Sequence, residues 1–369
     1  MQYIYLDNAA TTRVSEKAAN EVYKVLTSVY GNPSSNHSIG IEAEKIIYES
    51  RKKIARLISC DADCIIFTSG GTESNNLAIM GSINIKDIRN KKIITSGVEH
   101  PSVIQCMKNL ENQGFNVNYI APNKEGIIDP KIIWDLIDEN TVLVSIMHVN
   151  NETGNIYDIK TISKGIRYKN PSTIIHSDGI QAFGKMNINI DYLDVDLYSF
   201  SGHKIHAPKG IGGLYVKKGI NIKPIILGGS QENKKRGGTE NVSGIAGMGI
   251  ACEEINIDEN LEHIKTLSSF LLKELSVISN IHINSIGNVL EYILNFSIEG
   301  QKSEIILNKL KDKGIYVSNG AACSKSMYSK VLKNMGIDKK YIDSAIRVSF
   351  SKYNTLEEVE KLIECIKIL

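Results

Sequence analysis

Short apolar runs recur along the first 250 residues of the chain, and longer stretches with helical spacing separate them. Each run is rich in β-branched residues and apolar at nearly every position, which is typical of a strand buried on both faces. The intervening stretches, such as 41–58 and 132–137, are amphipathic. The predicted strands lie at 65–68, 92–95, 141–146, 173–176 and 196–200. Because strands alternate with helices, we expect a mostly parallel sheet covered by helices.

The pattern changes after Glu253, where this regular alternation stops. A polar break at 258–260 precedes a long helix with one apolar face. The last helix opens with Thr355 and Glu358 in a capping-box pattern, in which each side chain bonds the backbone of the other residue. Between them the sequence predicts a strand pair (281–283 and 292–296), a helix (303–312) and strands near 315 and 346. This part is predicted to be a smaller α+β domain, with the boundary near residue 256.

The composition is that of an ordinary globular protein, with 369 residues of which 42% are hydrophobic and 23% charged. Two domains are the natural expectation for this length. The net charge of +2 gives no reason to expect nucleic acid binding. The apolar runs are too short to span a bilayer, and the N-terminus does not resemble a signal peptide. Six cysteines in so long a chain do not indicate a disulfide scaffold, so we expect a cytoplasmic protein.

Polar residues collect where the predicted strands end, which is the edge at which open α/β sheets bind ligands. The first such segment, 68–73, reads Thr-Ser-Gly-Gly-Thr-Glu and precedes a helix. Glycines and a hydroxyl at a helix N-terminus can bind phosphate through exposed N–H groups and the helix dipole. Taken alone, a tight turn with Thr72 as the N-cap explains this segment better.

Lys204 follows a buried strand directly, an unusual place for a strongly hydrated side chain. A lysine over a cleft can form a Schiff base, and Asp178 ends the preceding strand. This pair suits pyridoxal phosphate, whose aldehyde needs an amine and whose ring nitrogen needs a carboxylate. A structural ion pair is the ordinary alternative, but His100, Asn151 and Gln181 are predicted at the same edge. Their convergence favours the cofactor site.

Two further residues are candidates for chemistry. Cys323 lies among small residues, which indicates an exposed loop, and Lys325 favours its thiolate form. Arg347 interrupts an apolar strand and can either bind a carboxylate through two hydrogen bonds or form an internal salt bridge. Cys60 and Cys64 have no matching second pair, so no metal site is expected there.

With these motifs in order, the sequence resembles the cysteine desulfurases of the NifS/IscS type, which belong to the class V aminotransferases with PLP fold type I. The resemblance covers nearly the whole chain. The family's pattern is matched by 5–12, 31–37, 68–76, 99–101, 150–152, 201–204, 210–212, 236–241 and the segment around Cys323. The resemblance implies an N-terminal arm (1–14) that packs with the small domain, a large PLP-binding domain (15–255) with a mostly parallel seven-stranded sheet, and a small C-terminal domain (256–369).

The resemblance also implies roles for individual residues. Lys204 forms the Schiff base and removes the substrate Cα proton, and Cys323 is the nucleophile. His100 stacks on the cofactor ring and moves protons, Asp178 pairs with the ring nitrogen, and Gln181 pairs with the ring hydroxyl. The cofactor-binding residues so implied are Gly71, Thr72, His100, Asn151, Asp178, Gln181, Ser201, His203, Lys204 and Thr239.

Substrate and partners follow from the same resemblance. Asn32, Asn151 and Arg347 bind the substrate, L-cysteine, which is converted to L-alanine while Cys323 becomes a persulfide. Acceptor proteins then take the sulfur for Fe–S cluster assembly or tRNA thiolation. Thr239 reaches the phosphate of a neighbouring subunit, which implies a homodimer. The segment that follows Cys323 is about two residues shorter than the family's longer version.

Other functions are compatible with parts of the pattern. A selenocysteine lyase, an aminotransferase or another enzyme of the same cofactor fold would retain Lys204 without needing Cys323. A non-catalytic sulfur carrier or regulatory partner would keep the fold alone, and the retention of Lys204, Asp178 and His100 argues against it. A dinucleotide-dependent oxidoreductase is disfavoured because no G-x-G-x-x-G follows the first strand.

Overall fold

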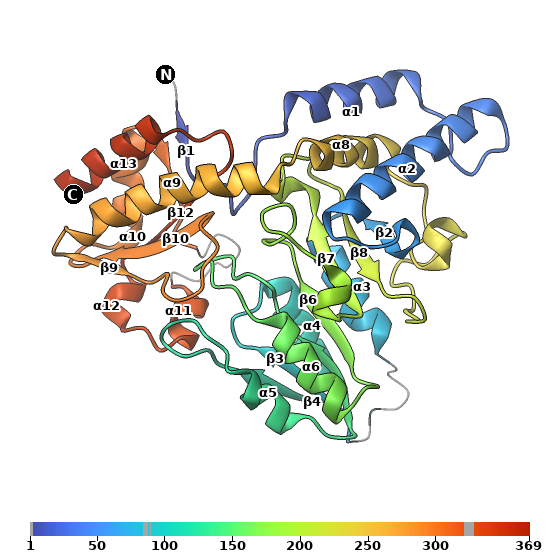
Figure 1. Ribbon diagram of the computed structural model, residues 1–369, viewed down its shortest axis with the longest axis horizontal. Coiled ribbons are helices and arrows are strands. Elements are labelled where there is room, and N and C mark those ends of the chain that lie inside the picture. Colours follow the sequence, from blue (N-terminus) through green and yellow to red (C-terminus); the bar gives the residue numbers. More distant parts are fainter. Residues whose placement is uncertain (1–2, 84–87, 89, 321–327) are drawn as a thin grey trace.

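A seven-stranded sheet forms the centre of the larger part of the protein (Figure 1), in a computed structural model that describes residues 3–83, 88, 90–320 and 328–369. The strand order is β2-β8-β7-β6-β5-β3-β4, and only β8 runs antiparallel to its neighbours. The strands are β2 (Ile65–Thr68), β3 (Lys92–Ser96), β4 (Asn116–Ile120), β5 (Thr141–Ser145), β6 (Ile174–Asp178), β7 (Leu197–Ser201) and β8 (Gly212–Val216). The predicted mostly parallel sheet is confirmed.

Two of these strands were not predicted from the sequence. β4 is an edge strand whose polar and apolar residues alternate, so it lacks the continuous apolar run of a central strand. β8 begins with two glycines, which are rare in strands. At Gly213 a Cβ would lie 2.4 Å from the ring of Phe200 on β7, so the aromatic side chain requires glycine opposite it. Packing between strands therefore overrides local propensity here.

Helices cover the sheet and pack mainly through their apolar faces. Helices α1, α2 and α8 lie together at one side (Figure 1), and the small residues of α8 let the other two approach closely. The helices of this part are α1 (Glu16–Ser28), α2 (Ser38–Leu57), α3 (Gly71–Ser82), α4 (Pro101–Asn112), α5 (Pro130–Leu136), α6 (Ile159–Lys169), α7 (Ile190–Leu193) and α8 (Val242–Glu253).

The C-terminal part is built on an antiparallel sheet of three strands, in the order β12-β10-β9. Its strands are β9 (Ile281–Ile283), β10 (Ile293–Ile298) and β12 (Ala345–Ser349), and its helices are α9 (Ile257–Ser276), α10 (Ser303–Asp312), α11 (Lys330–Asn334), α12 (Lys339–Ile342) and α13 (Leu356–Ile368). The predicted capping box is present at the start of α13, with Thr355 and Glu358 bonding reciprocally.

The N-terminal segment connects the two sheets. Strand β1 (Ile4–Tyr5) pairs in parallel with β11 (Ile315–Tyr316), and Asp7 forms a β-bridge with Ser349 at the end of β12. A few residues later, Thr12 donates its N–H to the carbonyl of His203, 2.9 Å away, beside the end of β7. This segment therefore reaches from the small sheet to the edge of the large one.

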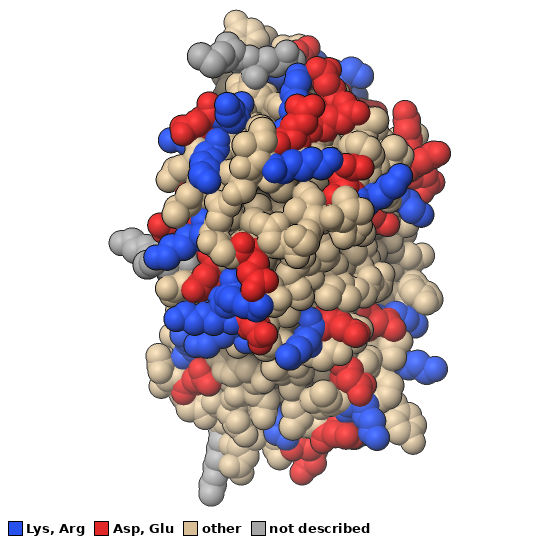
Figure 2. Space-filling model, turned by 90° about the vertical axis from the view of Figure 1, so that its left-hand side faces the viewer, with Lys and Arg blue, Asp and Glu red and all other residues tan. Residues whose placement is uncertain are grey.

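Positive and negative side chains are mixed on the surface. Figure 2 shows the face formed by the small-sheet end of the molecule, with Lys and Arg next to Asp and Glu. Ion pairs such as Lys340–Glu299 (2.6 Å) and Lys367–Glu274 (2.8 Å) contribute to this mixture. Within the described residues, no helix is both long and apolar enough to cross a membrane.

Candidate functional site

A cavity of about 510 Å³ opens where β6 and β7 end and α3 begins. It lies at the edge of the sheet where ligands are expected. The cavity brings together most of the residues that the sequence singles out, which are Gly71, Thr72, His100, Asn151, Asp178, Gln181, Ser201, His203, Lys204 and Arg347. Their convergence from separate strand ends is the geometry that the sequence analysis expects.

Lys204 occupies the first turn after β7, in the short helix η2 (Gly202–Lys204). Its amine donates hydrogen bonds to two carbonyls of the N-terminal segment, those of Ala9 (2.6 Å) and Ala10 (2.7 Å). Beside it, Nδ1 of His203 lies 3.1 Å from Oγ1 of Thr11. Burial and the charge of Lys204 lower the pKa of His203 to about 4, so its imidazole is neutral at pH 7.

Asp178 is the last residue of β6 and is buried at the base of the cavity. Its Oδ2 accepts a hydrogen bond from Nδ2 of Asn75 (2.7 Å), and its Oδ1 accepts one from the N–H of Ile180 (3.0 Å). Burial raises the pKa of this carboxyl, while the charge of His100 and the two hydrogen bonds oppose the rise. A cationic ring nitrogen would be a positively charged partner for this carboxylate, and a buried carboxylate is stable only when it is paired.

His100 is held at the start of α4. Its Nδ1 accepts a hydrogen bond from the N–H of Ser102 (3.2 Å) and lies 2.8 Å from Oγ of the same serine. That serine hydroxyl is also bonded by Asn75 (2.9 Å), so one asparagine links the imidazole to Asp178. Burial lowers the pKa of His100, which favours the neutral ring. The sequence analysis gave no role to Asn75, which lies one helical turn beyond Gly71 within the matched segment 68–76.

The start of α3 has the features of a phosphate site. The N-cap is Gly70, with φ of +148° and no capping side chain, so the predicted N-cap Thr72 lies instead in the first turn. Oγ of Ser201 is buried at this point and has no hydrogen-bond partner among the described residues. A Cβ on Gly71 would lie 2.2 Å from Cδ1 of Ile180, so this position in the first turn of α3 requires glycine. An orphaned hydroxyl at a helix N-terminus fits a bound phosphate.

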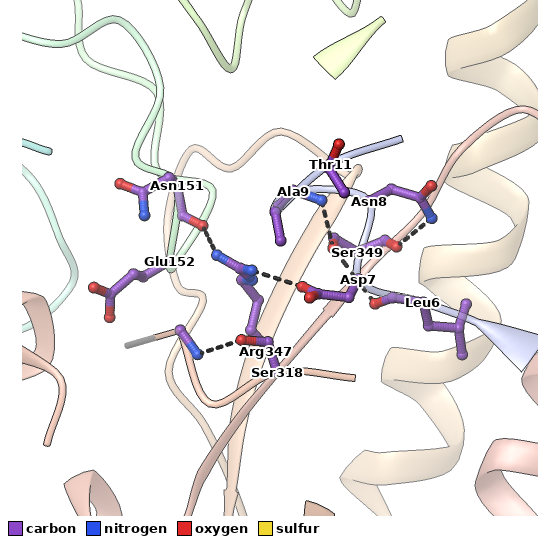
Figure 3. A network of polar contacts seen from close by, with 12 residues as sticks. Leu6, Asp7, Asn8, Ala9, Thr11, Asn151, Glu152, Ser318, Arg347 and Ser349 are labelled. Atoms are coloured by element: carbon purple, nitrogen blue, oxygen red, sulfur yellow. Dashed lines mark hydrogen bonds and ion pairs between the residues drawn. The ribbon is translucent and has the colours of Figure 1, made fainter. Parts of the chain in front are cut away.

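Arg347, on β12, reaches the cavity from the small sheet (Figure 3). Its guanidinium donates to the carbonyl of Asn151 (2.8 Å) and pairs with the carboxylate of Asp7 (2.7 Å). Its Nε–H is buried and has no partner in the described part of the chain. The internal salt bridge is therefore present, and binding of a substrate carboxylate stays a prediction for an arginine that also lines the cavity. Asn151 contacts this arginine through its backbone carbonyl. The sequence analysis instead expected the Asn151 side chain to bind the cofactor and the substrate.

Two predicted residues lie elsewhere, and a third is not among those described. Thr239 is exposed and absent from the cavity wall. Asn32 is exposed before α2 and accepts a hydrogen bond from the N–H of Ser34 (2.9 Å). Cys323 lies outside the described residues. As for metals, no group of three potential ligands among His, Cys, Asp and Glu occurs in the parts of the chain that are described.

Comparisons with known proteins agree with this geometry. The profile of the family described as Aminotransferase class-V matches residues 4–362. A cysteine desulfurase IscS of Dictyoglomus turgidum is 40% identical over 370 residues, which cover 99% of this chain and 93% of that one. A solved structure of a NifS-like protein has a TM-score of 0.94 at 36% identity and covers both chains completely. A structure described as SspA in complex with cysteine has a TM-score of 0.84 at 30% identity, covering 95% of this chain and all of that one.

Proposed function

This chain belongs to the aminotransferase class-V family and is a pyridoxal-phosphate-dependent cysteine desulfurase of the IscS and NifS kind, and we propose how its residues hold the cofactor and carry out the reaction. The observation that supports the proposal is one cavity in which Lys204, Asp178 and the unpartnered hydroxyl of Ser201 meet. When bound there, pyridoxal phosphate supplies an aldehyde for an amine and a ring that withdraws electrons from the substrate Cα.

The residues of the large sheet hold the cofactor. Asp178 pairs with the ring nitrogen, and Asn75 keeps the carboxylate oriented. Ser201 and the N–H groups at the start of α3 bind the phosphate, together with Thr72. Lys204 would supply the amine for the aldehyde, and its contacts with the carbonyls of Ala9 and Ala10 hold that amine at the cavity.

The remaining residues act on the substrate. Arg347 binds the α-carboxylate of L-cysteine through N–H groups that its present partners leave available. Lys204 removes the Cα proton, and the neutral imidazole of His100 transfers protons beside it. The thiolate of Cys323 then forms a bond with the substrate sulfur as the sulfur–carbon bond breaks. Carbon retains the electron pair and takes up a proton, so alanine leaves and Cys323 becomes a persulfide.

One experiment tests this function directly. The purified protein, loaded with pyridoxal phosphate, is incubated with L-cysteine, and alanine and the mass of the peptide that contains Cys323 are measured. We expect alanine together with a mass increase of one sulfur atom on that peptide. Cys323→Ala is expected to abolish alanine formation, and Lys204→Ala to abolish both activity and the visible absorption of the cofactor. Undiminished turnover of cysteine by Cys323→Ala would contradict the mechanism and favour a lyase that needs no thiol.

We also propose that the enzyme is a homodimer. Large apolar side chains are exposed near α1, with Tyr23 at 71%, Leu26 at 62% and Tyr30 at 75% exposure. A patch of this kind suits an interface between copies. Thr239, exposed in this chain, would then reach the phosphate of the second copy. Analytical ultracentrifugation is expected to give twice the monomer mass, and Thr239→Ala is expected to weaken cofactor binding without changing that mass.

The proposal extends to the fate of the sulfur. A protein acceptor, either an Fe–S scaffold or a tRNA thiolation enzyme, receives it from the Cys323 persulfide. A cytoplasmic location suits such exchange, and the five described cysteines are free thiols, as expected in a reducing compartment. Residues 1–14, 15–255 and 256–369 act in this proposal as the arm, the cofactor domain and the domain that contains Cys323.

A further inference from the structure

Lys185 is a buried amine that the reaction does not use. It follows β6 and is 5% exposed, and its Nζ donates a hydrogen bond to Oε1 of Gln181, 2.9 Å away. No carboxylate forms an ion pair with it among the described residues. The charges that act on it most, those of Lys204 and Arg347, are positive. Burying a lysine in such surroundings is costly, so its presence needs a specific explanation.

The hydrogen bonds of Gln181 explain why a lysine is buried at position 185. Its Oε1 accepts from Lys185, and its Nε2 donates to the carbonyl of Ala9 (2.9 Å). That same carbonyl accepts a hydrogen bond from Lys204 (2.6 Å). If the amide of Gln181 turned over, its NH₂ would face the N–H groups of Lys185 and its oxygen would face a carbonyl. Lys185 therefore specifies which end of the amide faces the catalytic lysine.

Lys185 is separated from the cofactor cavity by the residue it contacts. Gln181 lines the large cavity and Lys185 does not. Lys185 instead lines a second space of about 20 Å³, which shares only Lys204 with the first. Lys185 cannot touch a ligand in the large cavity, so any effect on such a ligand must pass through another residue.

We propose that Lys185 is a positioning residue that holds the amide of Gln181 with its N–H directed toward the ring hydroxyl of pyridoxal phosphate. This inference rests on the proposed function, in which Gln181 is the partner of that hydroxyl. An N–H donor stabilises the ionised ring oxygen and weakens its hold on the Schiff-base proton. The linkage between Lys204 and the cofactor then loses its proton at a lower pH than it would without the donor.

The state of the amine is consistent with this role. Burial lowers the pKa of Lys185 to about 7, with the charges of Lys204 and Arg347 acting in the same direction. An uncharged amine still donates N–H bonds, so the contact with Gln181 does not depend on full protonation. The ring of Tyr292, whose centroid is 5.7 Å away, closes the other side of the amine.

A double-mutant cycle tests the inference with a spectroscopic readout. Holoenzymes of the wild type, Lys185→Met, Gln181→Leu and the double variant are titrated, and the pH at which the cofactor absorption band changes is recorded. We expect each single variant to move this transition to higher pH by about one pH unit, the effect of losing one hydrogen bond. The double variant is expected to match Gln181→Leu, because Lys185 acts only through that amide.

Cofactor affinity gives a second measurement. Apoenzyme titrated with pyridoxal phosphate is expected to bind it about fivefold more weakly in Lys185→Met. Lys185→Gln keeps an N–H donor without the charge, and we expect its transition to stay close to that of the wild type. If Lys185→Met fails to fold, Lys185→Gln still decides the matter, since a transition moved as far as in Gln181→Leu would overturn the inference.

Two outcomes contradict the positioning role. Additive shifts in the double variant would mean that Lys185 acts by its own charge, and an unchanged transition in folded Lys185→Met would mean that it only fills space. Failure of the proposed function looks different. In that case the wild type would form no pH-dependent band with pyridoxal phosphate, or Lys204→Ala would retain it.

Discussion

At the scale of single residues, the site depends on partners that hold the chemical groups in place. Asn75 is an example, since its amide contacts both the carboxylate of Asp178 and the hydroxyl of Ser102 that bonds His100. It thereby connects the residue proposed to pair with the ring nitrogen to the residue proposed to stack on the ring. Its Oδ1 is buried without a partner among the described residues, so the donor end is the functional one.

We expect Asn75→Ala to lower kcat/KM for L-cysteine about tenfold and to weaken the binding of pyridoxal phosphate. The reason is that Asp178 loses a 2.7 Å hydrogen bond in a buried place, where such bonds to charged groups are strong. Steady-state kinetics and cofactor titration measure both effects. Asn109→Ala, an exposed asparagine on α4, is the matched control and should leave both unchanged. Equal kinetics for the two variants would refute this role.

Sequence analysis found those site residues that lie directly at strand ends. Asp178 and Ser201 end buried strands, and Lys204 follows one within a turn, so their convergence could be predicted from topology. Asn75 and Asp7 were given no individual role, because their importance comes from contacts across 103 and 340 positions that no local pattern records. Lys185 contacts a residue only 4 positions away, but the burial of its amine depends on the tertiary fold. The roles assigned to the site residues, including Cys323, stay predictions.

At the scale of elements, the N-terminal segment contributes more than its two-residue strand suggests. Asp7 pairs with Arg347 (2.7 Å), and the N–H of Ala9 donates to Oγ of Ser349 (2.8 Å), both on β12. The next carbonyls accept from Lys204. One short segment therefore fixes the arginine proposed for substrate binding and contacts the lysine proposed for catalysis.

We expect Asp7→Ala to raise KM for L-cysteine about tenfold with a smaller change in kcat. Without its carboxylate partner the buried guanidinium loses its fixed orientation, which weakens binding of the substrate carboxylate in ground and transition states alike. Asp7→Asn keeps an oxygen acceptor and should have a milder effect. An unchanged KM in Asp7→Ala would show that the cavity orients Arg347 without the N-terminal segment.

The last helix offers a test of an element predicted from sequence. Thr355 and Glu358 form both bonds of the capping box at the start of α13. Thr355→Ala is expected to lower the free energy of unfolding by about 1 kcal/mol, because two backbone N–H groups depend on this motif. Urea denaturation measures it. Thr266→Ala, exposed within α9, should not destabilise the protein, and a loss as large there would argue against a capping effect.

Among the strands, predictability followed burial. The continuous apolar runs of β2, β3, β5, β6 and β7 were predicted to within about two residues, as expected for strands buried on both faces. The edge strand β4 was not predicted, because its exposure to solvent allows polar residues in it. Strand β8 was not predicted, because the ring of Phe200 on the neighbouring strand requires glycine at position 213. Element boundaries that depend on tertiary packing are not contained in local patterns.

At the scale of the whole molecule, buried titratable groups make stability depend on pH. Glu99 is buried, with Oε1 accepting from Ser96 and from the N–H of Met147. Burial raises its pKa from 4.5 to about 8. Between these values the folded protein holds a proton that the unfolded chain has lost, so this group's contribution to stability falls as the pH rises.

We therefore expect Glu99→Gln to reduce the loss of stability between pH 5 and pH 8, by up to about 1 kcal/mol for each pH unit. Burial lowers the pKa values of His148 and His176 to about 4 and about 3. Below their ordinary value of 6.5, the contribution of these two groups to stability therefore rises with pH. The interval from pH 6.5 to 8 lies above the range of these histidines, and comparison with the wild type cancels the contribution of Lys185, whose pKa is lowered to about 7. The free energy of unfolding is measured for both proteins from pH 6.5 to pH 8. An equal fall in the wild type and in Glu99→Gln would contradict the raised pKa of Glu99.

The overall architecture followed from the alternation of the first 250 residues and its loss afterwards, because that alternation determines how strands can be connected. The path of the N-terminal segment could not be predicted from this alternation. Nothing in residues 3–12 alone indicates that they lie between two sheets, since their partners are at 203, 315 and 349.

That path has a consequence for how the protein is made. Residues 4–7 can pair with β11 and β12 only after residues 315–349 have been translated. The strands of the central sheet all precede residue 217, so that sheet can assemble before the strand that contains Arg347 has been synthesised. The pocket is therefore completed late in synthesis, because a chain that stops before residue 345 lacks both Arg347 and the strand that Asp7 pairs with.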